Sequence, residues 1–182
     1  MFLDRDGTLN RERGYVVHQR QIEVLAGART AVSMLDAAGW PLVVITNQSG
    51  IALGLYDHIA LARIHATLHA ALDELPRGYF HCPHHPAAPP ESAFGGTCVC
   101  RKPGDGLLRQ AAHVLGLSLP GSVVIGDSAR DLLMARGHSM RTILVRSGKP
   151  WQGELDQLTA AGCSPDAVVD DVEAAARLVL AG

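Results

Sequence analysis

Short apolar runs alternate with helical patterns along most of this chain, and the alternation limits the folds open to it. Runs of strand length occupy residues 1–3, 41–46, 78–82, 122–127, 142–146 and 167–169. Between them apolar side chains recur at helical spacing, for example at Ala28, Val32 and Leu35, and again within 61–72, 107–115 and 171–181. Buried strands that alternate with helices are typical of a parallel sheet covered on both faces. The sequence therefore predicts an α/β fold with a doubly wound parallel sheet.

Length and composition narrow the class of protein further. A chain of 182 residues is suited to one compact core, so we expect residues 1–182 to form a single domain. The formal net charge is -2, so the chain lacks the positive excess that binding to nucleic acid by charge requires. No apolar run approaches the ~18 residues of a membrane span. We expect a cytoplasmic monomer that binds a small molecule rather than nucleic acid or a membrane.

Polar side chains follow the predicted strands at the points where the strands end. Asp4 and Asp6 come after the first strand, residues 46–49 (TNQS) close the second, and Asp127 and Asp131 lie at and beyond the fourth. Each motif alone is weak, because turns also use Asp for hydrogen bonds to their own backbone. The carboxyl ends of parallel strands, however, meet at one edge of a sheet, where α/β proteins bind ligands. The convergence of the motifs predicts an active-site crevice there.

A phosphate monoester is the substrate that these residues suit. Two like unit charges ~4 Å apart repel by ~4 kcal/mol at an effective dielectric of ~20, so carboxylates near a phosphate need cations beside them. Asp4 and Asp127 offer the oxygen ligands that Mg2+ prefers, and Lys102 adds a second cation. We expect Asp4 to attack phosphorus and form an aspartyl-phosphate, with Asp6 as general acid and base. The phosphoryl oxygens are expected to contact Thr46 and the groups that follow it, Asn47, Gln48 and Ser49.

Three of the four cysteines fall in a loop that leads directly into residues 101–102, Arg and Lys. Within this loop, residues 82–100, the segment 83–96 is too long and too rich in Pro, Ala and Gly to be an idle connection. Three thiolates and one imidazole would make a closed tetrahedral set, the pattern of a structural zinc site. Inert buried thiols are the alternative, and His81 or His85 could serve in place of His84. The candidate ligands are Cys82, His84, Cys98 and Cys100.

Four motifs, in this order along the chain, resemble those of the haloacid dehalogenase-like (HAD-like) phosphatase superfamily. They are DRDGT at 4–8, TNQSG at 46–50, RKP at 101–103 and GDSARD at 126–131. Further segments resemble the zinc-containing D-glycero-D-manno-heptose 1,7-bisphosphate 7-phosphatases, namely GYV at 14–16, CPHHP at 82–86, CVCRKP at 98–103 and VRSGKP at 145–150. The resemblance implies a HAD-like Rossmannoid fold. It also implies Mg2+-dependent removal of the 7-phosphate in the biosynthesis of nucleotide-activated heptose, for lipopolysaccharide or S-layer glycans.

The resemblance assigns roles to individual residues as well. It implies that Asp4 is the nucleophile and Asp6 the acid and base, and that Asp6 binds Mg2+ through its backbone carbonyl. It implies that Arg101 recognises the substrate and that Lys102 stabilises the phosphoryl group. Ser128 stands where relatives often carry Lys, and we expect it to contribute mainly its backbone. The segment that the resemblance places near the sugar is Glu12, Arg13, Gly14 and Tyr15, although a turn with a packed aromatic would also explain the last two.

The resemblance favours zinc in the loop, with His84 as the imidazole ligand. About 40 residues separate Asp6 from Thr46 and about 55 separate Thr46 from Lys102, which leaves little room for a cap domain. We therefore expect no large cap. The zinc-clamped loop would instead fix the direction in which Arg101 and Lys102 leave it.

Other interpretations fit parts of the pattern. A histidinol-phosphate phosphatase resembles the chain in its catalytic and zinc motifs, but the 13 residues between the two ligand pairs favour the heptose enzyme. A phosphorylation-dependent receiver domain is disfavoured by the length, the zinc loop and the acid two residues after the nucleophile. A zinc-stabilised binding protein would have no need of the whole catalytic set. His65 and His69 have the spacing of a helical metal pair but no nearby acidic base, so we expect them at the surface.

Overall fold

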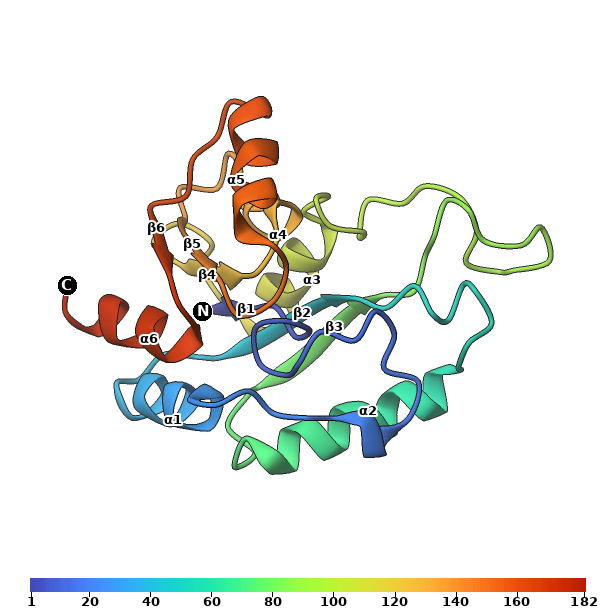
Figure 1. The fold of residues 1–182 in the computed structure, drawn as a ribbon, viewed down its shortest axis with the longest axis horizontal. Coiled ribbons are helices and arrows are strands. Elements are labelled where there is room, and N and C mark those ends of the chain that lie inside the picture. The colour runs from blue at the N-terminus through green and yellow to red at the C-terminus, as the bar shows by residue number, and fades with distance from the viewer.

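The computed structural model describes residues 1–182 and places six strands in one parallel sheet (Figure 1). The strands are β1 (Phe2–Leu3), β2 (Val43–Asn47), β3 (Gly78–Cys82), β4 (Val123–Gly126), β5 (Arg141–Val145) and β6 (Ala167–Val169). Their order across the sheet is β3-β2-β1-β4-β5-β6. The order reverses at β1, so a crevice opens between β1 and β4 at their carboxyl ends. Every predicted strand is present, and the doubly wound α/β fold is confirmed.

Helices cover both faces of the sheet (Figure 1). One face carries α1 (Ala28–Ala37), α2 (His58–Ala71) and α6 (Val172–Leu180). The other carries α3 (Gly106–Leu115), α4 (Ala129–Leu133) and α5 (Trp151–Ala160). None of these helices combines the length and the apolar character that crossing a membrane requires.

The core lies on both sides of the central strands, because successive residues of a strand point to opposite faces. Leu3 of β1 and Val44 of β2 pack in the cluster that contains α1 and α6. Their neighbours Phe2 and Val43 pack in the cluster that contains α3. All four side chains are fully buried. Both faces of the sheet are therefore filled with apolar side chains, and the polar residues are left to the strand ends.

Three long connections carry the chain around the carboxyl edge of the sheet. Residues 4–27 follow β1 and contain one short 3-10 helix, η1 (Gln19–Gln21). Residues 48–57 follow β2 without a helix or strand, and residues 83–105 follow β3 in the same way. The last of these reaches away from the body of the molecule in Figure 1. No cap domain covers this edge, so the crevice is bordered by the connections themselves.

Two helices and one side chain differ from what the sequence suggests. No helix was expected over α4 or α5, because α4 has only 5 residues and α5 buries a single side chain, Leu158. His65 was expected at the surface, but only 9% of it is exposed. The reason is Tyr79 of β3, whose ring stacks on the imidazole with the ring centroids 4.9 Å apart. The spacing of His65 along α2 could not reveal that partner.

Candidate active site

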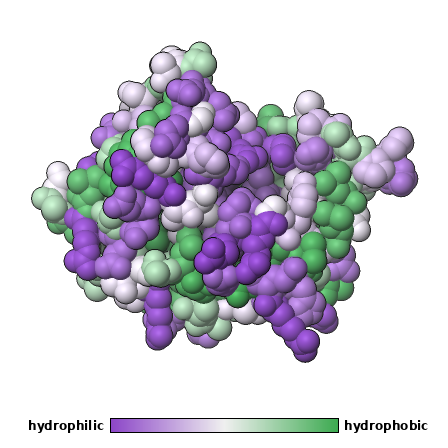
Figure 2. Space-filling model, viewed as in Figure 1, coloured by the Kyte–Doolittle hydropathy of each residue, from purple (hydrophilic) through white to green (hydrophobic).

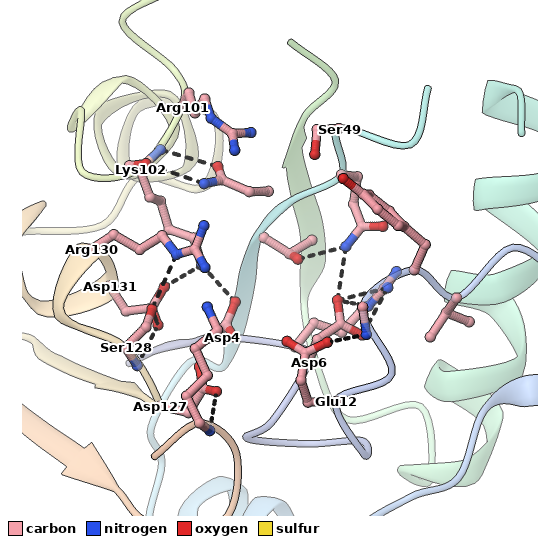
Figure 3. A pocket seen from close by; sticks show the side chains of 18 of the residues that line it. Asp4, Asp6, Glu12, Ser49, Arg101, Lys102, Asp127, Ser128, Arg130 and Asp131 are labelled. Carbon is pink, nitrogen blue, oxygen red and sulfur yellow. Dashed lines mark hydrogen bonds and ion pairs between the residues drawn. The ribbon is translucent and has the colours of Figure 1, made fainter. Parts of the chain in front are cut away.

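A cleft of about 460 Å³ opens at the carboxyl edge of the sheet, where the crevice was expected. It is lined by 20 residues, of which 3 are hydrophobic. Hydrophilic residues gather around the hollow in the face shown in Figure 2, and Figure 3 shows acidic and basic side chains of the cleft pointing toward one another. A cleft with this lining suits a small charged ligand rather than an apolar one.

Lys102 lies between two carboxylates at the base of the cleft (Figure 3). Its Nζ is 2.5 Å from Oδ1 of Asp4 and 2.6 Å from Oδ1 of Asp131. It also donates a hydrogen bond to the carbonyl of Ile45 at 2.9 Å. Although burial opposes its charge, the carboxylates of Asp131 and Asp4 raise the pKa of Lys102 to about 12. Lys102 is therefore a permanent cation beside the expected nucleophile.

The buried carboxylates nevertheless outnumber this lysine. Ligand atoms of Asp4, Asp127 and Asp131 lie within 4.8 Å of one another, and all three residues are buried. Burial, together with repulsion from Asp131, raises the pKa of Asp4 to about 7. Burial and repulsion from Asp4 raise the pKa of Asp127 to about 8. Hard oxygen ligands that lack a compensating charge fit a divalent cation such as Mg2+, so the residues present suit the metal that the sequence predicts.

The main chain holds Asp127 closely. Its Oδ2 accepts a hydrogen bond from the backbone N–H of Lys149 at 3.0 Å. Gly7 approaches Asp127 from the connection that follows β1, and its φ is 87°. A Cβ on Gly7 would collide with Oδ2 of Asp127. Only glycine combines that backbone conformation with the space that Asp127 needs.

Asp6 is surrounded by N–H donors. Arg5 contacts it twice, with Nε 3.1 Å from Oδ2 and Nη2 2.9 Å from Oδ1. Asn10 donates to Oδ1 and Gln48 to Oδ2, each at 2.9 Å. The guanidinium of Arg5 is fully buried. All of these donors are N–H groups, and each carboxylate oxygen of Asp6 accepts from two of them.

The residues at the carboxyl end of β2 organise the cleft more than they occupy it. The side chain of Asn47 holds the backbone of Lys102, donating to its carbonyl at 3.2 Å and accepting from its N–H at 3.1 Å. Gln48 donates to the hydroxyl of Thr46 at 2.9 Å and accepts from the hydroxyl of Tyr56 at 2.7 Å. Thr46, Gln48 and Ser49 are buried and line the cleft with Asn47. Asn47 therefore positions Lys102 across 55 residues of sequence.

The segment expected near the sugar contributes unevenly. Glu12, Gly14 and Tyr15 line the cleft, and a carboxylate of Glu12 accepts a hydrogen bond from the backbone of Gly14 at 2.6 Å. Arg13 does not line it, and its Nη2 is 2.6 Å from Glu23 instead. Arg101 lines the cleft with its Nη1 donating to the carbonyl of His84 at 3.0 Å. His84 of the cysteine loop is thus hydrogen-bonded directly to Arg101, the arginine that is expected to recognise the substrate.

The four predicted zinc ligands come together at the ends of that loop. The sulfur atoms of Cys98 and Cys100 lie 3.5 and 3.2 Å from that of Cys82 and 3.2 Å from each other. Nδ1 of His84 lies 3.4 Å from the sulfur of Cys100 and 3.7 Å from that of Cys82. Around a metal with ~2.3 Å bonds to sulfur, tetrahedral sulfur atoms would be about 3.8 Å apart, so the cluster could hold zinc with a small expansion. Burial raises the pKa of the Cys82 thiol, because it disfavours the charged thiolate. A bound cation would stabilise that thiolate and offset the effect of burial.

His81, in β3, and His85, in the loop, take no part in the cluster. Nε2 of His81 lies 3.4 Å from Nδ1 of His58, and His85 lines the cleft. The geometry therefore favours His84 as the imidazole ligand.

Several residues that line or support the cleft are not predicted from the sequence. The sequence places Asp131 beyond the fourth predicted strand without assigning it a role, although its position four residues after Asp127 is a usable signal; in the structure it lies in the first turn of α4. Ser128 contributes its side chain as well as its backbone, because its hydroxyl donates to Asp131 at 2.5 Å. The other lining or supporting residues that the sequence does not predict are Arg5, Asn10, Val16, Tyr56, His85, Arg130 and Lys149.

Fold and site together define a hydrolase of the HAD-like class, and a family model described as HAD-hydrolase-like matches residues 99–175. A D-glycero-beta-D-manno-heptose-1,7-bisphosphate 7-phosphatase of Photorhabdus laumondii is 37% identical over 161 residues, which cover 86% of this chain and 85% of the relative. The enzyme of the same name from Escherichia coli K12 is 37% identical over 160 residues, which cover 86% and 83%. The chain belongs to this phosphatase family, which places it among the phosphoric monoester hydrolases.

Solved structures agree with this assignment. The D,D-heptose 1,7-bisphosphate phosphatase of B. bronchiseptica, complexed with magnesium and phosphate, superposes with a TM-score of 0.83 at 33% identity, covering 100% of this chain and 97% of that one. The D,D-heptose 1,7-bisphosphate phosphatase of Burkholderia thailandensis gives a TM-score of 0.68 at 28% identity, with coverage of 100% and 97%. The HAD-like fold predicted from the motifs is confirmed.

Proposed function

We propose that this chain removes the 7-phosphate of D-glycero-D-manno-heptose 1,7-bisphosphate, with residues 1–182 acting as one domain. The observation that carries the chemistry is the buried group of Asp4, Lys102, Asp127 and Asp131 at the base of a polar cleft. The choice of sugar is supported by the relatives, which match most of this chain and are named for the heptose 1,7-bisphosphate as substrate.

Asp4 is the nucleophile in this proposal. One of its carboxylate oxygens attacks phosphorus, the bond between phosphorus and O7 of the sugar breaks, and an aspartyl-phosphate forms. Asp6 gives its proton to the departing oxygen. It then takes a proton from the water that attacks the phosphorus of the aspartyl-phosphate, which restores Asp4 and releases inorganic phosphate.

Asp6 has to change partners in order to act. In the structure all four of its hydrogen bonds come from N–H groups of Arg5, Asn10 and Gln48. A carboxyl group that donates its proton to a leaving oxygen must give up at least one of them. We propose that substrate binding draws Asp6 away from part of this set.

The phosphoryl group is held by charge and by fixed donors. Lys102 is kept charged and in place by Asp4, Asp131 and the side chain of Asn47. Thr46 and the backbone groups of Asn47 and Ser49 face the remaining phosphoryl oxygens, whereas the backbone N–H of Gln48 already donates to the carbonyl of Cys82 at 2.8 Å. Preorganised donors of this kind contribute most where charge develops during phosphoryl transfer.

Two metals complete the proposal. Mg2+ would be held by the carboxylates of Asp4 and Asp127 and by the backbone carbonyl of Asp6, and when bound it neutralises charge on the phosphoryl oxygens. Zn2+ would be held by the cluster at the ends of the loop, as a closed structural site. Its ligands are Cys82, His84, Cys98 and Cys100. Because Arg101 donates to the carbonyl of His84, the zinc would also orient Arg101 toward the sugar.

Phosphate release with Mg2+ tests the proposal. The substrates are the α and β anomers of the heptose 1,7-bisphosphate and, as the matched rival, histidinol phosphate. We expect kcat/KM for one heptose anomer to exceed that for histidinol phosphate by more than ~10²-fold, since a site built to bond a substrate's hydroxyls rejects a compound that lacks them. A preference for histidinol phosphate would contradict the proposed substrate. One slow round of phosphate release without turnover would indicate a receiver domain instead.

A further inference from the structure

Five cations line the cleft, and three of them have no carboxylate partner. Arg5 pairs with Asp6, and Lys102 pairs with two buried aspartates. The unpaired cations are Arg101, Arg130 and Lys149. A cation that is not already neutralised retains its attraction for an incoming anion. The cleft therefore holds three cations, besides Lys102, whose side chains make no close ion pair and can contact the anionic groups of a substrate.

Arg130 is anchored by one nitrogen and free at the other two. Its Nε donates to the hydroxyl of Ser128 at 3.3 Å, and that hydroxyl donates to Asp131 at 2.5 Å. Neither Nη atom makes a hydrogen bond within the protein. Arg130 is half-buried at the start of α4 and lines the cleft (Figure 3). The free edge of a guanidinium is a planar fork whose N–H groups match two oxygens of a phosphate.

Lys149 lies on the same side of the cleft as Arg130. Its backbone N–H donates to Asp127 at the end of β4, and Arg130 lies three residues after Asp127. Strands β4 and β5 are neighbours in the sheet, so the connections that follow them are adjacent. Lys149 lines the cleft, and its ammonium makes no close ion pair, although its charge helps to lower the pKa of Asp127 against the effect of burial. Two free cations thus flank Asp127, which is a proposed ligand of Mg2+ and is already bonded to the main chain.

The other sides of the cleft offer different chemistry. The segment 12–16 contributes the carboxylate of Glu12 and the phenol of Tyr15, which suit the hydroxyls of a sugar rather than an anion. Nη1 of Arg101 already donates a hydrogen bond to the carbonyl of His84. Arg101 is also the single unpaired cation on the side of the cysteine loop. Only the side next to β4 and β5 presents two cations together.

We infer that Arg130 and Lys149 form a second anion subsite, which holds the far phosphate of a bisphosphate while the other phosphate reacts at Asp4. This inference rests on the proposed function and names the residues that make the chain prefer a bisphosphate to a monophosphate. The far phosphate does not react, so its contacts are equally strong in the ground state and in the transition state. Binding of that kind is expressed in KM rather than in kcat.

The test compares the heptose 1,7-bisphosphate with the heptose 7-phosphate, which lacks only the far phosphate. Arg130→Met is expected to lower the ratio of kcat/KM values, bisphosphate over monophosphate, by about 10- to 100-fold, the range of one or two charge-assisted hydrogen bonds. The loss should fall on KM for the bisphosphate. Arg130→Lys keeps the charge without the fork and should lower the ratio less, and Lys149→Met should lower it as well. Arg63→Met, which removes an exposed cation of α2 that does not line the cleft, is the matched control and should leave the ratio unchanged.

The outcomes separate this inference from the proposed function. If the wild type prefers the bisphosphate and Arg130→Met keeps that preference, the subsite is wrong while the function stands. A ratio that falls with Arg101→Met but not with Arg130→Met would place the far phosphate on the side of the cysteine loop and would also overturn the subsite. If the wild type turns over neither heptose phosphate, both proposals fail. A loss in kcat alone, equal for the two substrates, would indicate a structural effect of Arg130 and contradict the inference.

Discussion

At the scale of single residues, the position of Asp127 depends on a glycine as much as on its own hydrogen bonds. Gly7 has φ at 87° and leaves no room for a Cβ beside the carboxylate of Asp127. Gly39 has nearly the same φ, 83°, but nothing within 4 Å of its missing Cβ. The pair separates the cost of a left-handed backbone from the cost of displacing a proposed metal ligand.

Gly7→Ala and Gly39→Ala are therefore expected to differ in activity more than in stability. Each loses about 1 to 2 kcal/mol of unfolding free energy from the left-handed conformation, and Gly7→Ala loses somewhat more through the collision. Only Gly7→Ala should raise the Mg2+ concentration for half-maximal turnover, by ~10-fold or more, because Asp127 must shift. Urea unfolding and a Mg2+ titration measure the two effects. An unchanged Mg2+ requirement in Gly7→Ala would argue against Asp127 as a ligand.

At the scale of secondary-structure elements, the sequence predicts strands and their ends well because both depend on local patterns. The apolar runs located all six strands, and the polar residues that end β1, β2 and β4 do converge on one cleft. What it missed depends on contacts between elements. Asp131 and Arg130 become part of the cleft only because α4 starts at Ala129, two residues after Asp127. Helix α5 buries too little apolar surface to be recognised from the sequence. The burial of His65 needed knowledge of Tyr79 on another element.

The loop after β3 is the element whose role is easiest to isolate. Cys98→Ser removes one proposed zinc ligand, whereas Cys163→Ser removes a cysteine outside the cluster. We expect Cys98→Ser to lose its zinc and to lose about 10- to 100-fold in kcat/KM, because Arg101 and Lys102 follow the clamp and small displacements are costly in a catalytic site. Cys163→Ser should keep its zinc and its wild-type kcat/KM. Elemental analysis and phosphate release provide the two readouts, and a zinc-free sample with wild-type turnover would refute the role of the loop.

At the scale of the whole molecule, stability should depend on a buried histidine as the solution becomes acidic. Burial, with smaller contributions from Arg5 and His81, lowers the pKa of His65 to about 2. The unfolded chain takes up a proton on this group below about pH 6.5, whereas the folded chain does not. The unfolded state thus binds more protons as the pH falls below ~6.5, and stability is lost in that direction.

His65→Phe should remove part of this acid sensitivity. Between about pH 7.5 and pH 5 the wild type is expected to lose ~2 kcal/mol more unfolding free energy than the variant, at ~1.4 kcal/mol per pH unit below 6.5. His113→Gln replaces an exposed histidine of α3 and should follow the wild type. Urea unfolding at the two pH values measures the loss of unfolding free energy in the wild type and in both variants. Parallel losses in all three proteins would mean that His65 is protonated in the fold.

The central claim for the molecule is that a capless HAD-like cleft hydrolyses a sugar bisphosphate through Asp4. The most direct measurement is kcat/KM for the preferred heptose 1,7-bisphosphate anomer, with Mg2+, in the wild type and in Asp4→Asn. We predict a loss of at least ~10³-fold in the variant, because an amide cannot replace the carboxylate as nucleophile. Thermal unfolding should show the variant folded, since the substitution relieves repulsion among buried carboxylates. A folded Asp4→Asn protein that retains kcat/KM within about tenfold of the wild type would contradict the account.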